Sequence, residues 1–296
     1  MAFSKNIIVL IAVLCLSATA SGQSTESKLI EAIQETGSFV RTNDDGLVLE
    51  VNAALSRFSN ADMEKLSAFD HISDLNLNRQ PIDDSGIFRI KNLRNLQTLC
   101  LGKTKVTDKS LNTISAFTKL TQLHLHDTAL TDSGIQQLSK LSELTDLSLT
   151  GTKLTDKGMK SLSNLKNLEQ LFVERTTISD VGILEIERLN NICVVTLIDT
   201  QVTDDALKSL AKLPHLRMLF LDGTRITSNG LRLLSKCEKL EVLYLDRTQI
   251  DDNAFQHLEK LPALKSVSVQ KTPVTLSGVK SFRKKRPHVR VTLADR

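Results

Sequence analysis

Hydrophobic residues recur along most of the chain with a period of 24 residues. Each unit begins with an alternating stretch, as in Leu99 and Leu101 or Leu147 and Leu149, and continues with apolar residues about three positions apart. An alternation of two predicts a short strand with one buried face, and a spacing near three predicts one buried stripe of a short helix. We therefore predict that each unit is one strand followed by one helix.

The repeat keeps its register without insertion or deletion. Its ten units start at residues 48, 72, 96, 120, 144, 168, 192, 216, 240 and 264 and cover residues 48–287. We number the places of each unit from 1 to 24, so that Leu96 occupies place 1 and Leu99 occupies place 4. Neither half of a unit can bury its apolar face alone, whereas stacked copies bury a continuous core.

Three polar places also recur in the consensus L-x-x-L-x-L-x-x-T-x-(I/V/L)-(T/S)-D-x-G-(L/I/M)-x-x-L-x-x-L-x-x. Thr or Ser at place 12, as in Thr131, stands where a helix N-cap oxygen is needed, and Asp at place 13, as in Asp132, puts a carboxylate at the helix N-terminus. Thr at place 9, as in Thr128, is predicted to bond the turn backbone of adjacent coils. We interpret these places as structural.

This pattern resembles that of leucine-rich repeat proteins, L-x-x-L-x-L-x-x-N/C-x-L, over about four fifths of the chain. Its T-D-x-G-L half is similar to secreted planctomycete-type repeat proteins and to the repeat halves of F-box and ribonuclease-inhibitor-like proteins. The resemblance implies an α/β solenoid shaped as a horseshoe, with a parallel concave sheet and short helices on the convex side. The chain departs from the family by carrying Thr at place 9.

Both ends of the chain are predicted to differ from the repeats. Residues 1–20 combine one cation, a short apolar run and an A-x-A site, which predicts a secretory signal peptide and no membrane span. We predict an N-terminal cap of a helix and a hairpin over residues 21–47, and a C-terminal capping strand over residues 288–296. The Cys-rich caps of animal members are absent, so we expect an exported bacterial protein, periplasmic or extracellular.

Composition excludes few functions. The formal net charge of +4 is too small to indicate nucleic-acid binding by itself. The sequence has no nucleophile elbow, phosphate loop, H-E-x-x-H motif or Gly-rich dinucleotide turn. We therefore expect a non-catalytic binding module with no cofactor.

The concave strand face is where function is expected, because places 3, 5, 7 and 8 point away from the core. These places become apolar on the four coils between residues 168 and 263, with charged residues beside them. Apolar clusters with a charged rim mark interaction surfaces, so we predict that this patch binds a protein or peptide. Its predicted residues are Phe172, Glu174, Arg175, Val194, Ile198, Met218, Phe220, Asp222, Val242, Tyr244, Asp246 and Arg247.

Two alternatives remain open at this point. The same face is compatible with binding carbohydrate or a cell-wall polymer. His124 and His126 lie two residues apart on one strand and face the same way, with Cys100 beside them and Asp127 and Asp146 nearby, which is compatible with a metal-dependent enzyme. This second group lacks defined ligand spacing, so we predict no metal site there and favour a protein partner.

Overall fold

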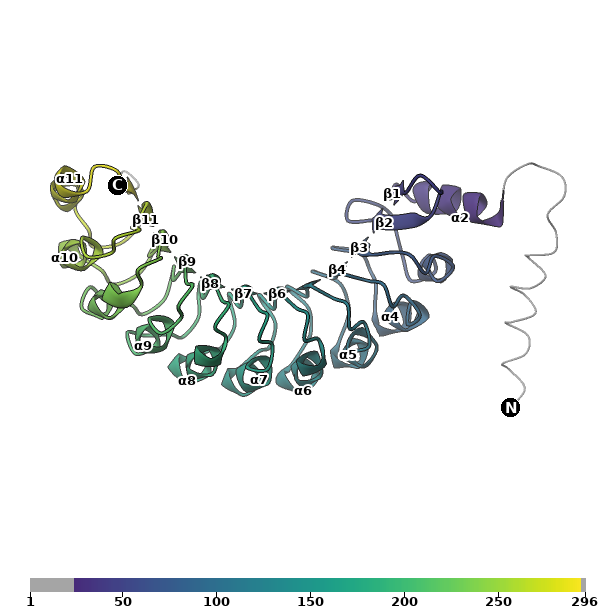
Figure 1. Ribbon diagram of the computed structural model, residues 1–296, viewed down its shortest axis with the longest axis horizontal. Helices are drawn as coiled ribbons and strands as arrows, with labels where there is room; N and C mark the ends of the chain where they lie inside the picture. The colour runs from purple at the N-terminus through teal and green to yellow at the C-terminus, as the bar shows by residue number, and fades with distance from the viewer. Residues whose placement is uncertain (1–23, 294–296) are drawn as a thin grey trace.

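A computed structural model describes residues 24–293 of the chain. Twelve strands form one open sheet in sequence order on the inner side of an arc, and the helices line its outer side (Figure 1). β1 and β2 are antiparallel, and the pairs from β2 to β12 are parallel. The predicted solenoid with a concave sheet and convex helices is therefore confirmed, with an antiparallel strand added at its N-terminal edge.

Most strands are three residues long, because each coil contributes only one short crossing to the sheet. The strands are β1 (Phe39–Thr42), β2 (Val48–Asn52), β3 (Asp74–Asn76), β4 (Thr98–Cys100), β5 (Gln122–His124), β6 (Asp146–Ser148), β7 (Gln170–Phe172), β8 (Val194–Thr196), β9 (Met218–Phe220), β10 (Val242–Tyr244), β11 (Ser266–Ser268) and β12 (Arg290–Thr292).

The outer layer mixes α-helices with 3₁₀ segments. The α-helices are α2 (Thr25–Gln34), α3 (Met63–Leu66), α4 (Asp84–Arg89), α5 (Asp108–Ile114), α6 (Asp132–Ile135), α7 (Asp156–Leu162), α8 (Asp180–Leu184), α9 (Ala206–Leu210), α10 (Phe255–Leu258) and α11 (Leu276–Lys285). The 3₁₀ segments are η1 (Gln136–Lys140), η2 (Glu185–Arg188), η3 (Gly230–Lys236) and η4 (Asp252–Ala254). The helical half of a unit is therefore less regular than its strand.

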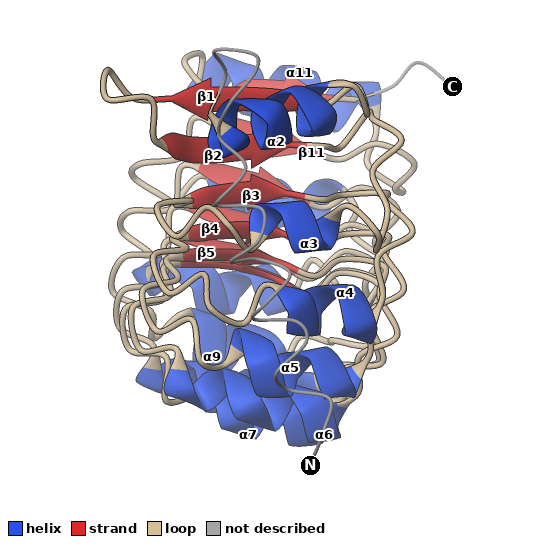
Figure 2. Cartoon of the chain, turned by 90° about the vertical axis from the view of Figure 1, so that its right-hand side faces the viewer, coloured by secondary structure: helices blue, strands red, loops and turns tan. Residues whose placement is uncertain are grey.

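The core fills the space between the sheet and the helices. Leu99, Leu123 and Leu147 are register partners across β4, β5 and β6, and all three are fully buried. Figure 2, which views the stack from its N-terminal side, shows the strands lying side by side with the helices in a second layer. Because the repeat contains no insertion, each parallel strand pairs with the residues one unit later, and equal places stack on equal places.

Threonine at place 9 is buried, but its bond differs from the predicted one. Thr128 Oγ1 donates to the carbonyl of Leu125 in its own turn, at 2.6 Å. The prediction of a bond to adjacent coils was wrong, because this short hydroxyl has one proton and a nearby carbonyl takes it. The same bond is made by Thr104, Thr152, Thr176, Thr200, Thr224, Thr248 and Thr272.

Aspartate at place 13 joins neighbouring coils in addition to starting a helix. Asp108 accepts from the backbone N–H and the hydroxyl of Thr131 in the next coil, at 2.8 and 2.6 Å. The hydroxyl of Thr131 in turn accepts from the N–H of Ser133 and caps its own helix. The same inter-coil pair recurs at Asp84–Thr107, Asp132–Thr155, Asp156–Ser179, Asp180–Thr203, Asp204–Thr227 and Asp252–Thr275.

The glycine of the T-D-x-G segment makes room for this aspartate. A Cβ on Gly134 would lie 2.3 Å from Oδ1 of Asp108 and 2.9 Å from its Cα. In the units after the first, place 15 holds glycine or a small residue such as Ser110 or Ala206. The small residue at place 15 of one unit is therefore required by the aspartate side chain at place 13 of the preceding unit, which packs against it.

Two pairs of neighbouring coils use other residues at places 13 and 12. In both pairs a hydrogen-bond acceptor still faces a donor. Asn60 Oδ1 accepts from the N–H of Asp83 at 3.1 Å. Ser228 donates its hydroxyl to Asp251 Oδ1 at 2.6 Å and accepts the N–H of Asp251 at 2.9 Å. A carboxylate at place 12 thus comes with an amide or hydroxyl at place 13 of the coil before it, which keeps two carboxylates from meeting.

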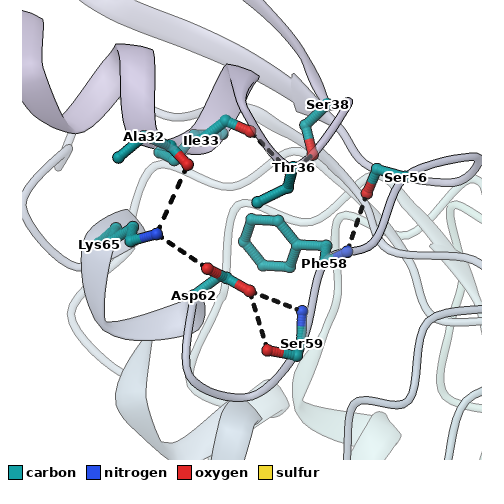
Figure 3. Close-up of polar contacts among 9 residues, drawn as sticks. All are labelled: Ala32, Ile33, Thr36, Ser38, Ser56, Phe58, Ser59, Asp62 and Lys65. Atoms are coloured by element: carbon teal, nitrogen blue, oxygen red, sulfur yellow. Dashed lines mark hydrogen bonds and ion pairs between the residues drawn. The ribbon is translucent and has the colours of Figure 1, made fainter.

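The N-terminal end of the core is covered by α2, the hairpin of β1 and β2, and the loop that follows it (Figure 3). Ile33 of α2 and Phe58 of the loop are fully buried. Lys65 of α3 donates to the carbonyl of Ala32 at 3.5 Å and pairs with Asp62 at 2.9 Å. A cation thus meets the carbonyl end of α2, where the helix dipole favours positive charge.

The predicted signal peptide, residues 1–20, lies outside the described residues. Among the helices between residues 24 and 293, none is long and apolar enough to cross a membrane. At the other end, β12 pairs with β11 and places Val291 beside Val267, while residues 294–296 lie beyond the described part.

Candidate functional site on the concave face

Place 3 forms an aliphatic row on the concave sheet. Val194, Met218 and Val242 are register partners across β8, β9 and β10. Each is half-buried, with neighbouring strands on both sides. Together with β7 these strands span roughly 14 Å, which is wide enough for several residues of a bound chain.

Place 5 forms an aromatic row parallel to the first. The rings of Phe220 and Tyr244 meet edge to face, with centroids 4.9 Å apart and an interplanar angle of 69°, an arrangement that favours the pair. Thr196 lies between Phe172 and Phe220 in the register and is only 4% exposed. Its Oγ1 is buried without a hydrogen-bond partner.

Place 7 supplies the acidic groups, and they differ from one another. Asp222 is 5% exposed, so it is buried at the patch rather than standing at its rim. Its Oδ1 accepts from the N–H of Asp246 at 3.0 Å, whereas its Oδ2 has no partner. Burial, together with the nearby carboxylate of Asp246, raises the pKa of Asp222. Asp246 itself is fully used, since it accepts from Ser268 and twice from Gln270.

Place 8 carries an ion pair that spans two coils. Nη2 of Arg175 reaches Oδ1 of Asp127, 48 residues earlier, at 2.7 Å. The guanidinium passes over Gly151, whose backbone has a φ of 68°. A Cβ on Gly151 would lie 2.2 Å from Asp127 Oδ1, so the bridge needs a glycine in the coil between its partners.

The same bridge recurs three coils later. Arg247 reaches Oδ1 of Asp199 at 2.6 Å across Gly223, where a Cβ would lie 2.0 Å from the same oxygen. Both arginines predicted at the rim are therefore neutralised by carboxylates of this chain. Glu174 and Ile198 complete the predicted set and are half-buried at place 7.

The structure places the twelve predicted residues on β7–β10 and in the turns that follow these strands. Thr196 and the two carboxylates that hold the arginines, Asp127 and Asp199, were not among the residues predicted for the patch. Place 8 reads Asp, Gly, Arg, Asp, Gly, Arg in six successive units, from residue 127 to residue 247. This order of acid, glycine and arginine is the sequence signal that accompanies the bridges, and the stacked coils show which side chains bond.

A separate polar group lies on β4–β6. His124 Nε2 is 3.2 Å from Asp146 Oδ1, and its Nδ1 is 3.5 Å from Cys100 Sγ. These hydrogen bonds from Asp146 and Cys100 raise the pKa of His124 to about 10. His126 covers Gly102, and burial lowers the pKa of His126. Within residues 24–293, no group of three or more His, Cys, Asp or Glu side chains is arranged to hold a metal ion.

Comparison with known proteins identifies the family to which this repeat architecture belongs. A family model described as leucine-rich repeat region matches residues 47–287. The chain belongs to the leucine-rich repeat family. This repeat fold is typical of protein–protein interaction modules, and the family is generally non-enzymatic. A search of curated proteins found no match.

Solved structures of bacterial repeat proteins are similar to this leucine-rich repeat protein. An internalin C2 of Listeria monocytogenes shares 24% identity over 72% of this chain and 84% of its own, with a TM-score of 0.55. Another Listeria monocytogenes internalin shares 19% identity over 96% and 93%, with a TM-score of 0.55. A Leptospira interrogans repeat protein shares 18% identity over 77% and 74%, with a TM-score of 0.50. These likenesses show the fold alone.

Proposed function

We propose that this protein is an exported, non-catalytic binding protein whose patch on β7–β10 takes a protein or peptide partner. The observation that carries the proposal is a continuous apolar surface on the concave sheet. The aliphatic row of Val194, Met218 and Val242 lies beside the edge-to-face pair of Phe220 and Tyr244, and all five side chains are only half-buried. A half-buried apolar surface with charged residues beside it is suited to a partner that covers it.

The chemistry of the patch describes its partner. The paired rings of Phe220 and Tyr244 offer such a partner a rigid apolar contact. Because Arg175 and Arg247 are already paired with Asp127 and Asp199, we expect a partner segment that presents apolar side chains rather than carboxylates.

The experiment selects peptides from a displayed random library on the wild-type protein. The variant carrying Phe220→Ala and Tyr244→Ala is expected to bind the selected peptides about 100-fold more weakly, because both rings are lost from the centre of the contact. A control carrying Val181→Ala and Leu184→Ala removes two exposed apolar side chains from convex α8 and is expected to bind as the wild type does. Dissociation constants measured by calorimetry decide the comparison.

Two outcomes would contradict this proposal. Equal affinity of the selected peptides for the wild type and for the Phe220/Tyr244 double variant would place binding elsewhere. If glycans on an array bound to the wild type and lost affinity in the double variant while no peptide was selected, the carbohydrate alternative would replace the peptide partner.

Export is proposed from residues 1–20 alone, whose cation, apolar run and A-x-A site form a cleavable signal. We expect protein recovered from the periplasm or the medium of an expressing bacterium to begin after Ala20. Intact-mass measurement tests this expectation. Retention of Met1–Ala20 in the recovered protein would contradict it.

A further inference from the structure

Three side chains of different chemistry line up across β4, β5 and β6. Cys100 on β4 and His124 on β5 are register partners at place 5, and Asp146 stands at place 3 of β6. The contacts run from Sγ to Nδ1 at 3.5 Å and from Nε2 to Oδ1 at 3.2 Å. A thiol, an imidazole and a carboxylate are thus joined in series through the two ring nitrogens, which is the arrangement that activates a sulfur nucleophile.

The surroundings of this cluster contain few competing charges. On the concave strands packed against it, the titratable groups are Asp74 of β3, His126 beyond the end of β5 and Asp146 of β6, and Lys103 and Asp127 follow in the turns. Asp74 accepts from its neighbour Ser73. Asp127 is held by Arg175 at 2.7 Å and lies 3.9 Å from Lys103, so both cations are paired with a carboxylate other than Asp146. Asp146 is therefore the carboxylate that hydrogen-bonds to His124.

The other described thiols provide an internal contrast. Cys193 is half-buried, and Cys237 is buried in the core. Burial raises the pKa of both thiols, that of Cys237 to about 11. Neither makes a hydrogen bond to an imidazole comparable to the one at Cys100. Cys100 is also buried, with 8% of the residue exposed, but it stands on the concave sheet and not in the core between sheet and helices.

We propose that Cys100 is a thiol–disulfide exchange site whose sulfur is activated by the hydrogen bond to His124, with Asp146 as the positioning residue, and that it takes small organic disulfides. The site lies on β4–β6, apart from the apolar patch on β7–β10, and does not depend on the function proposed for that patch. Because Cys100 is buried, we expect small disulfides and not protein disulfides to react with it.

The step balances without a further reactant. The Cys100 thiolate attacks one sulfur of a disulfide R–S–S–R, a new bond forms between Sγ and that sulfur, and the original S–S bond breaks. The leaving thiolate R–S⁻ takes the proton from His124 Nδ1 and departs as the thiol R–SH. The products are Cys100 as a mixed disulfide and His124 as a neutral imidazole, still hydrogen-bonded through Nε2 to Asp146. Cys100 is oxidised, and half of the disulfide is reduced.

The test measures how fast 2,2′-dipyridyl disulfide modifies each cysteine of the folded full chain between pH 5 and pH 9.5. Peptide mass mapping reads Cys100 separately from Cys193 and Cys237. An ordinary thiol loses about tenfold in rate for each pH unit below about 8.5, because only its thiolate reacts. The rate at Cys100 is expected to change by less than about threefold between pH 6 and pH 8, because His124 is hydrogen-bonded to the reacting sulfur.

Three variants test whether the reactivity of Cys100 depends on His124 and Asp146 or only on the access of the reagent to its sulfur. His124→Gln is expected to slow the reaction of Cys100 at least about tenfold at pH 6 while leaving its rate at pH 9.5 within about twofold of the wild type, since activation by an imidazole matters least where the solution itself is basic. Asp146→Asn is expected to shift the pH profile in the same direction by a smaller amount. His126→Gln is the matched control on the same strand, and its profile is expected to equal that of the wild type.

The proposal is overturned if the modification rate of wild-type Cys100 falls tenfold for each pH unit, or if Cys100 forms no adduct in the folded chain. It is also overturned if the His124→Gln and His126→Gln variants have the same pH profile of modification. Far-UV circular dichroism shows whether each variant is folded. Should His124→Gln fail to fold, the profile of Asp146→Asn decides: a profile equal to that of the wild type overturns the role of the carboxylate.

Discussion

Replacing Ser228 by aspartate is expected to lower the free energy of unfolding by about 2–3 kcal/mol, and adding Asp251→Thr is expected to restore most of that loss. Ser228 now donates to Asp251 at 2.6 Å, so a carboxylate in its place would meet a second carboxylate in a largely buried contact. The double change re-creates the Asp-to-Thr pair that Asp204 and Thr227 form one coil earlier.

Urea denaturation of the wild type, both single variants and the double variant measures this coupling as a double-mutant cycle. Asn229→Asp is the control, because it adds the same charge at the next residue, which is exposed to solvent. We expect the control to change the free energy of unfolding by no more than about 0.5 kcal/mol. Additive effects of the two single changes would contradict the idea that the pair, and not each residue, fits the stack.

Replacing Phe117 by alanine is expected to cost about 3–5 kcal/mol of unfolding free energy. Phe117 occupies place 22, is fully buried and is among the largest side chains of the core. Its removal deletes apolar contacts and leaves a cavity between two coils, which packed neighbours refill only in part. Because each coil touches only its neighbours, the loss is also expected to make unfolding less cooperative at this junction.

Phe117→Leu is the matched control, since leucine occupies place 22 in six other units, including Leu141 and Leu165. This change keeps most of the buried volume, so we expect a cost below about 1.5 kcal/mol. Thermal and urea unfolding followed by circular dichroism measure both variants. Equal losses for alanine and leucine would show that the aromatic shape, and not the filled volume, is what this place requires.

Much of this protein was predictable from its sequence because one pattern repeats without interruption. The alternation at Leu99 and Leu101 predicted the strands, and the spacing of three predicted the outer helices. With equal unit lengths, the register of the sheet follows directly, so the opposition of Phe220 and Tyr244 on neighbouring strands was also predictable. The concave position of the apolar patch follows from the same register, whereas its role in binding stays a proposal.

The contacts between coils could not be assigned from the unit pattern alone. Asp108 was interpreted as a helix-start charge because that role is local, yet its carboxylate also bonds Thr131 in the next coil. Arg175 was predicted to lie beside the apolar patch with no partner assigned, yet it bridges two coils to Asp127. In each case the choice depends on the reach and direction of a side chain, which are settled only when the coils are stacked.

The sequence by itself determined the period, the alternation of strand and helix, the strand register and the identity of the residues that line the concave face. Only the tertiary structure decided which polar groups on that face pair with one another and which, like Asp222 Oδ2, are left without a donor. The physical reason is that hydrophobic burial depends on periodic position, which a sequence displays. Hydrogen bonds and ion pairs instead depend on distance and angle between atoms of different coils.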